Sequence, residues 1–171
     1  MPASKLRTAH RAINPIKTEF FSYGFRPFFL AASIYAALAM SLWLAWIAIH
    51  AANASLIWIT ISGPPHVWHA HEMIFGFGAA ALTGFLLTAV PNWTGAVPLA
   101  NQPLITLFAL WIAGRLAMMF SAAIPPAIVA AIDLIFIPAL GLHVAKQLFV
   151  RPQPRNIIFL GLLSTLFLAN V

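Results

Sequence analysis

Long runs of apolar residues, separated by short polar or proline-containing breaks, occupy most of the chain. About twenty consecutive apolar residues are enough for a helix to cross the hydrocarbon core of a bilayer. Pro91 and Gly95 predict that the second of these helices ends near Val90. The pattern as a whole predicts an all-α, polytopic bundle of about five membrane helices, over residues 27–49, 66–90, 104–120, 125–144 and 157–171.

Two of the apolar runs are too short to cross a bilayer. The stretch Leu56–Ile61 lies in the gap between the first two helices, and its length is typical of a re-entrant or interfacial piece. The last run has only about fifteen residues when the sequence stops, which is less than a full crossing needs. We therefore expect the chain to be the N-terminal part of a larger bundle, with the remaining helices of a longer chain as partners.

The composition excludes a soluble domain and a disordered chain. Hydrophobic residues make up 62% of the sequence and charged residues only 7%, whereas about 25% of the residues of a soluble domain are charged. Disordered segments are polar, so they are excluded as well. The chain has no cysteine, so a metal would need histidine, methionine, carboxylate or carbonyl ligands.

The basic residues are concentrated in two segments of the chain that can lie on the same side of the membrane. The net charge is +6, but the basic residues do not form a continuous face of the kind that binds nucleic acid. Retention of Lys and Arg on the cytoplasmic side predicts that the tail of residues 1–26 is cytoplasmic, together with the loop before the last helix. The residues concerned are Lys5, Arg7, Arg11, Lys17 and Arg26 in the tail, and Lys146, Arg151 and Arg155 near the loop.

Arg115 and Asp133 are charged residues inside predicted membrane helices. Each charge near the middle of a bilayer costs about 2.5–3.5 kcal/mol on insertion scales. At a rise of about 1.5 Å per residue, the two lie at similar depths below the turn that joins their helices. We expect them to form an ion pair, which either holds two helices together or sets the charge of a functional site.

The start of the second helix carries three histidines within six positions. His66, His69 and Met73 are spaced three and four residues apart, so they share one helix face, whereas His71 points to the opposite side. Glu72 is placed to accept the second ring proton of His69, as in many metal sites. The alternative is that these histidines only contact headgroups and water near a helix end. His50, at the outer end of the first helix, is expected at a similar depth.

Four motifs in this order resemble the NnrS family of bacterial membrane proteins. They are Gly24–Leu30 (GFRPFFL), Trp68–Phe77 (WHAHEMIFGF), Thr88–Gly95 (TAVPNWTG) and the pair Gly114–Arg115. The resemblance implies a protein of the bacterial inner membrane that contains haem and copper and is linked to nitric oxide tolerance.

The resemblance and the chemistry of the side chains together suggest roles for the histidine cluster. His69 and His71 are the first-choice haem or metal ligands, His66 is a further candidate, and Met73 could supply a thioether to copper. Glu72 would orient an imidazole.

Two arginines are expected to act as counter-charges in the same site. Arg26 and Arg115 could neutralise anionic groups such as haem propionates. Whether the protein turns over a substrate is left open by the sequence. A small-solute transporter, or a sensor or assembly subunit that binds a cofactor without catalysis, would fit the same pattern.

Overall fold

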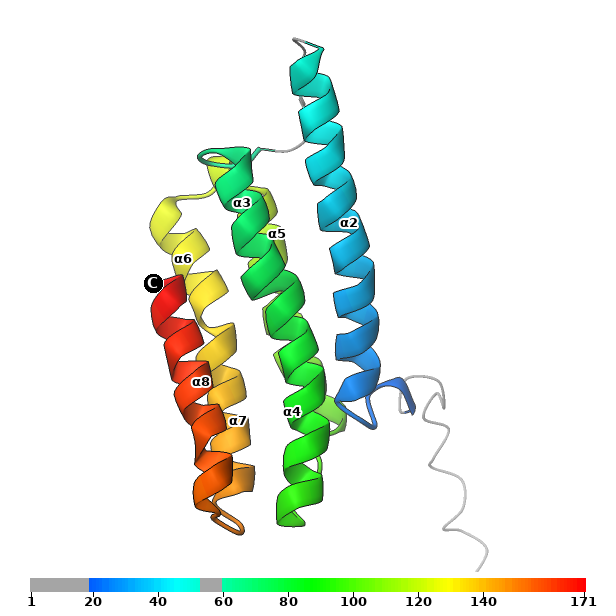
Figure 1. Ribbon diagram of the computed structural model, residues 1–171, viewed down its shortest axis with the longest axis vertical. Coiled ribbons are helices and arrows are strands. Elements are labelled where there is room, and N and C mark those ends of the chain that lie inside the picture. The colour runs from blue at the N-terminus through cyan, green and yellow to red at the C-terminus, as the bar shows by residue number, and fades with distance from the viewer. Residues whose placement is uncertain (1–18, 53–59) are drawn as a thin grey trace, which may run out of the picture.

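Every regular element in the described part of the chain is a helix (Figure 1). The computed structural model describes residues 19–52 and 60–171; most of the expected re-entrant stretch, and most of the basic tail, lie outside these residues. The helices are α2 (Phe25–Ala51), α3 (Pro65–His71), the π-helical turn η1 (Glu72–Gly78), α4 (Ala79–Thr94), α5 (Asn101–Met119), the 3-10 turn η2 (Ser121–Ala123), α6 (Pro126–Leu134), α7 (Phe136–Leu148) and α8 (Pro154–Asn170).

Within the described residues, four segments are long and apolar enough to cross a membrane, which confirms the predicted class of fold. They are Phe25–Ala51, Pro65–Thr94, Asn101–Met119 and Pro126–Leu148, and α8 is a shorter apolar helix. Many large apolar side chains remain exposed on their outer faces, including Leu44 and Leu142. A soluble surface would not carry so many, and lipid is their natural solvent.

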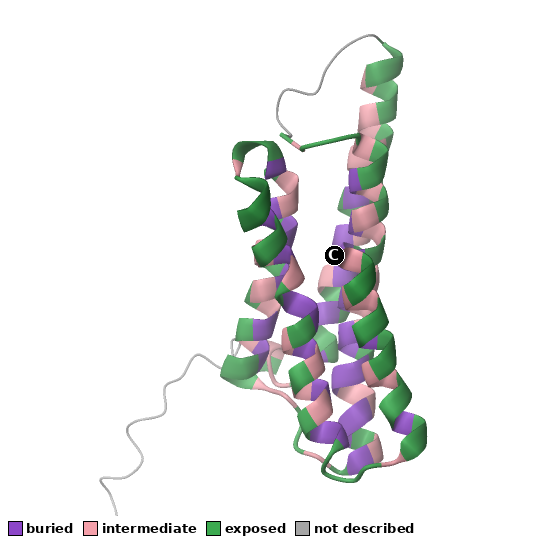
Figure 2. Cartoon of the chain, turned by 90° about the vertical axis from the view of Figure 1, so that its left-hand side faces the viewer, coloured by how far each residue is buried: buried purple, intermediate pink, exposed green. Residues whose placement is uncertain are grey.

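The continuous rod of α3, η1 and α4 lies at the centre of the bundle (Figure 1). It packs against α2 on one side and against α7 on the other, while α5 packs against α6 and α7, and α8 packs against α7. Figure 2 shows that the buried residues face the inside of this arrangement. The fully buried side chains include Phe28, Leu86, Val90, Leu107 and Leu140.

The second membrane helix continues beyond the predicted end at Val90, so that prediction was wrong. Pro91 lies inside α4, which ends only at Thr94. Pro91 has no backbone N–H, so the Leu87 carbonyl four residues earlier loses its helical partner, but membrane helices tolerate proline at such positions. Gly95 then adopts a left-handed conformation with φ +70°, and this conformation terminates the helix.

The predicted fourth span consists of two helices, α6 and α7, that meet at Ile135. Pro138 has no backbone N–H, so the Leu134 carbonyl four residues earlier loses its helical partner. The second piece extends to Leu148 rather than ending near Val144.

A pair of hydrogen bonds joins the segment before α3 to the turn between α5 and α6. The Ala122 amide donates to the Thr60 carbonyl at 2.8 Å, and the Ser62 amide donates to the Ser121 hydroxyl at 2.9 Å. These bonds fix the start of α3 relative to α5 and α6, and they therefore help to position the histidine segment.

Candidate functional site

The centre of the bundle contains a group of four ionisable side chains, which we call the ion cluster: His71, Glu72, Arg115 and Asp133. Glu72 is completely buried, and Arg115 and Asp133 are each 5% exposed. Arg115 donates from Nη1 to Glu72 Oε1 at 2.8 Å and from Nη2 to Asp133 Oδ1. The predicted Arg115–Asp133 pair is therefore confirmed, and Arg115 also binds a second carboxylate.

Both ring nitrogens of His71 face oxygen acceptors. Nδ1 lies 2.9 Å from Glu72 Oε1, and Nε2 lies 2.8 Å from Asn170 Oδ1 and 3.3 Å from Asp133 Oδ2. The Asn170 amide also donates to Asp133 Oδ2 at 2.8 Å. An imidazolium donates from both nitrogens, and in that form its charge and that of Arg115 balance the two carboxylates. Neither nitrogen is then free to bind a metal.

Tyr35 connects α2 to the ion cluster. Its hydroxyl donates to Glu72 Oε2, the carboxylate oxygen that Arg115 does not use. Glu72 is therefore held by side chains from α2 and α5 and by its neighbour His71. Because every polar group in a bilayer needs an internal partner, this set of bonds allows a completely buried carboxylate to exist there.

The π-helical turn η1 begins at Glu72, directly at the cluster. Such turns are rare and are frequent at functional sites. Gly76 lies in this turn, and a Cβ there would come within 2.5 Å of the Tyr35 ring and 3.1 Å of Glu72 Oε2. The Gly76 carbonyl accepts a hydrogen bond from the Trp111 indole at 3.0 Å. A residue without a side chain is therefore needed for Tyr35 to approach the turn.

His69 lies on the other side of the rod and belongs to a stack of four rings. Its ring centroid lies 4.9 Å from that of Trp43, Trp43 lies 5.4 Å from Trp46, and Trp46 lies 4.9 Å from His50. His50 is thus linked to His69 through the two tryptophans rather than by direct contact. The Nδ1 atom of His69 is buried and has no hydrogen-bond partner among residues 19–52 and 60–171.

The prediction of a hydrogen bond between His69 and Glu72 was wrong. Glu72 binds His71 instead. The reason is geometric: His69 faces α2, where Trp43 covers its ring, whereas the Glu72 carboxylate faces Arg115 on α5.

The other residues singled out from the sequence lie outside the ion cluster. His66 is exposed, and Met73 is half-buried and packs against the apolar core. Arg26, in the first turn of α2, donates to the Glu19 carbonyl at 2.6 Å. It precedes Tyr35 by nine residues, or about 14 Å of helix. In residues 19–52 and 60–171, no three His, Asp or Glu side chains are grouped so that they could hold a metal ion.

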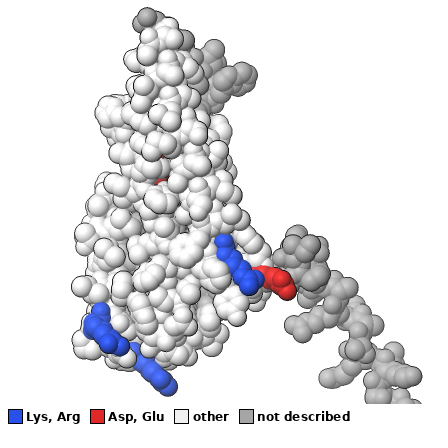
Figure 3. All heavy atoms as spheres, turned by 45° about the vertical axis from the view of Figure 1, so that its right-hand side comes forward, with Lys and Arg blue, Asp and Glu red and all other residues white. Residues whose placement is uncertain are grey.

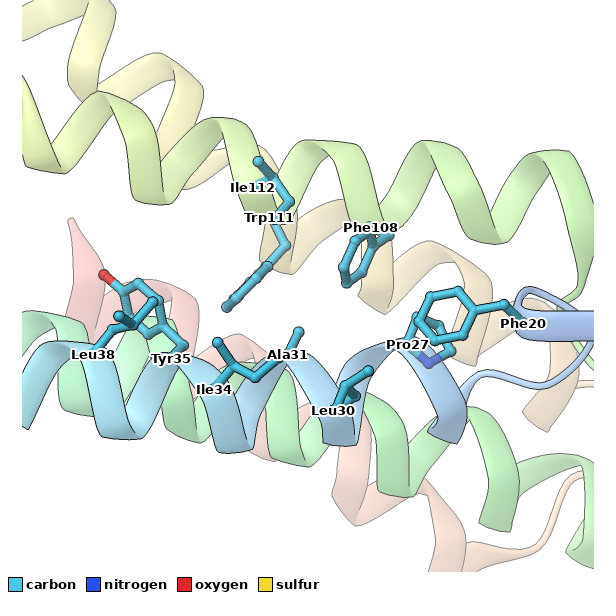
Figure 4. Close-up of a pocket in the computed structure, with 10 residues that line it drawn as sticks. All are labelled: Phe20, Pro27, Leu30, Ala31, Ile34, Tyr35, Leu38, Phe108, Trp111 and Ile112. Atoms are coloured by element: carbon cyan, nitrogen blue, oxygen red, sulfur yellow. The ribbon is translucent and has the colours of Figure 1, made fainter. Parts of the chain in front are cut away.

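Two hollows of different character adjoin the cluster. An apolar cleft of about 240 Å³ lies between α2 and α5, and the Tyr35 ring is part of its wall (Figure 4). A more polar recess of about 260 Å³ is lined by His71, Asp133 and Asn170. The hydrogen bonds of the cluster connect the two hollows through Glu72.

Tyr35, Asn170 and Trp111 were not identified from the sequence. Tyr35 offered a signal, because it is the one tyrosine inside a predicted span and a buried tyrosine hydroxyl usually needs a partner. Asn170 stands at the end of an apolar run, and nothing in the local pattern shows that it reaches Asp133.

One protein family matches the chain: the sequence model described as "NnrS protein" covers residues 19–171. No curated protein matches, and no solved structure does. The matched range includes all four residues of the ion cluster.

Proposed function

Because the chain belongs to the NnrS family, we propose that it is an inner-membrane protein that protects bacteria against nitric oxide. The observation that carries the proposal is the family match over residues 19–171. The site supports it, because the motif Trp68–Phe77, which resembles the family, contains His71 and Glu72 of the ion cluster. Arg115, in the Gly114–Arg115 motif, belongs to the cluster as well.

The positions of the exposed charges favour a cytoplasmic N-terminus. Figure 3 shows basic side chains at one end of the molecule and near the start of the described chain, with a largely uncharged surface elsewhere on that face. The exposed basic residues of the described part are Arg26, Lys146, Arg151 and Arg155. Because Lys and Arg are retained on the cytoplasmic side, this end belongs in the cytoplasm.

The apolar cleft suits a small uncharged molecule such as nitric oxide. The apolar cleft is lined by side chains such as Leu30, Ile34 and Ile112 (Figure 4), so a molecule dissolved in the lipid can enter it without losing hydration. The ion cluster behind Tyr35 supplies a fixed set of charges and dipoles next to this entry.

Haem and copper are the cofactors that we propose, with a ligand set revised by the geometry. His71 does not fit as a ligand, because both of its nitrogens bind oxygen atoms. His69 fits better, because its Nδ1 has no partner within the described part of the chain, and Met73 and the exposed His66 are the next candidates. A haem held by His69 would supply an iron that binds small diatomic molecules, and the ion cluster would keep the surrounding helices in place.

Replacing His69 and replacing His71 should therefore have different effects on the cofactor content of the protein. We expect His69→Ala to lower the haem or copper bound per purified protein several-fold, whereas His71→Asn retains it. The measurement is the Soret absorbance together with metal analysis of protein purified from membranes. Equal cofactor content in wild type and His69→Ala, or a loss confined to His71→Asn, would contradict the proposed ligand.

The protective role is tested by growth under nitric oxide. We expect a strain that lacks the gene to stop growing at a dose of nitric oxide donor that the complemented strain survives. The measurement is the lag time and growth rate with and without the donor, with the empty vector as the control. A complemented strain that is as sensitive as the deletion strain, despite normal amounts of protein in its membrane, would overturn the proposal.

A transporter for a small solute is the second candidate, favoured by the interrupted helices. The π turn at Glu72 and the break at Ile135 lie in two membrane segments, and discontinuous helices with buried charge are common in transporter sites. A preparation free of haem and metal that moves a solute into vesicles would favour this candidate over the first.

A further inference from the structure

An apolar groove of about 590 Å³ runs along the outside of α7 and α8. Its walls include Pro138, Gly141 and Leu142 from α7 and Leu160 and Phe167 from α8. Leu142 is 65% exposed, so the groove opens away from the core. A groove of this kind in a membrane helix pair can accommodate a flexible hydrocarbon chain.

The groove points toward a group of basic side chains. Pro138, Leu142 and Lys146 follow one another at intervals of four residues, so Lys146 continues the groove-lining face of α7. Arg151 lies in the connection between α7 and α8, and Arg155 lies in the first turn of α8. These three residues are the basic end of the groove.

No carboxylate side chain of the protein neutralises the basic end. The whole sequence has only three acidic residues. Glu72 and Asp133 are buried in the ion cluster, and Glu19 precedes α2, next to Arg26. The side-chain hydrogen bond at the basic end joins Arg155 to Gln153, which is uncharged. Three cations therefore lack an acidic partner within the chain.

A buried donor in the same place also lacks a partner. Asn156 is 6% exposed, and its Nδ2 atom makes no hydrogen bond within the described chain. It precedes Leu160 of the groove by four residues, so it lies on the same face of α8. An unpaired donor is costly in a bilayer, so Asn156 adds an unsatisfied polar group to this end of α8.

The geometry points to a binding site for an anionic phospholipid, with an acyl chain in the α7–α8 groove and the phosphate at the basic end. Leu142 and Leu160 each lie six residues from the end of their helix, which is about 9 Å. This separation leaves room for the glycerol and ester groups between the chain and the phosphate. Basic pockets between membrane helices bind anionic headgroups in this way.

Lipid selectivity tests the site with the intact protein. The protein is placed in nanodiscs that contain equal amounts of phosphatidylglycerol and phosphatidylcholine, and the lipids that it retains are counted by native mass spectrometry. We expect wild type to retain phosphatidylglycerol preferentially and Lys146→Gln to lower this preference about five-fold, the effect of one cation near a membrane surface. Arg26→Gln is the matched control, because it removes a cation on α2, and we expect it to leave the preference unchanged.

A second experiment fills the groove with a large side chain. A Cβ added at Gly141 meets no atom within 4 Å beyond its chain neighbours and its own helix backbone, and the same is true of Gly161, but only Gly141 lines the groove. We expect Gly141→Phe to abolish the retained lipid and Gly161→Phe to keep it. Equal retention of both lipids by wild type would overturn the proposal, and so would equal behaviour of the two phenylalanine variants. A Gly141→Phe variant that loses a dimer but keeps its lipid would assign the groove to a second copy of the chain instead.

Discussion

Replacing Arg115 with methionine is expected to lower the free energy of unfolding by about 3–5 kcal/mol, the cost of breaking a buried ion pair on one side. Arg115 is the charge shared by Glu72 and Asp133. Without it, two buried carboxylates have only His71 as a cationic partner. The measurement is unfolding in mixed micelles by titration with dodecyl sulfate, followed by tryptophan fluorescence.

The control for this prediction is Arg26→Met, which removes the same charge from an exposed position. Surface substitutions usually change stability by no more than about 0.5 kcal/mol, so the two variants should differ clearly. If Arg115→Met were as stable as Arg26→Met, Arg115 would not be the charge that holds the cluster together.

Replacing Gly76 with alanine is expected to lower stability by about 1–3 kcal/mol, the usual cost of overpacking a core. The new methyl group would come within 2.5 Å of the Tyr35 ring, so Tyr35 must move. We expect this movement to break the hydrogen bond between Tyr35 and Glu72. The same unfolding titration measures the loss.

Gly141→Ala is the matched control, because its methyl group enters open space. Alanine is favoured over glycine in a helix by up to about 1 kcal/mol, so this variant should be neutral or more stable. A Gly76→Ala variant that gained stability in the same way would show that Tyr35 does not pack against η1 as described.

The fold and part of the site could be predicted because they depend on local patterns. Apolar runs of sufficient length define the membrane helices, and the helical rise alone placed Arg115 and Asp133 at the same depth. The periodicity also placed His69 and His71 on opposite sides of the helix, and in the structure they have separate partners.

The rest depends on contacts between distant parts of the chain. Asn170 reaches His71 from 99 residues away, and no local pattern indicates such a contact. The end of α4 was missed because Pro91 is tolerated within a membrane helix. The partner of Glu72 was misassigned because spacing along one helix ignores the neighbours on α2 and α5 that orient the carboxylate.

These contacts also change the functional interpretation of the histidine segment. The sequence alone favours His69 and His71 equally as ligands, but the structure divides them between two roles. His71 is part of the charge balance of the cluster, whereas His69 ends the ring stack and has a nitrogen for which the described residues offer no partner.

A double-mutant cycle between Glu72 and Arg115 tests most directly whether these residues share one buried site. The free energy of unfolding is measured for Glu72→Gln, for Arg115→Met and for the double variant. The Glu72 and Arg115 side chains are 2.8 Å apart. We therefore predict that the double variant loses less unfolding free energy than the two single variants lose together, and that the difference, the coupling energy, is about 1–3 kcal/mol. Single losses that add to within about 0.5 kcal/mol, as for distant sites, would contradict the account.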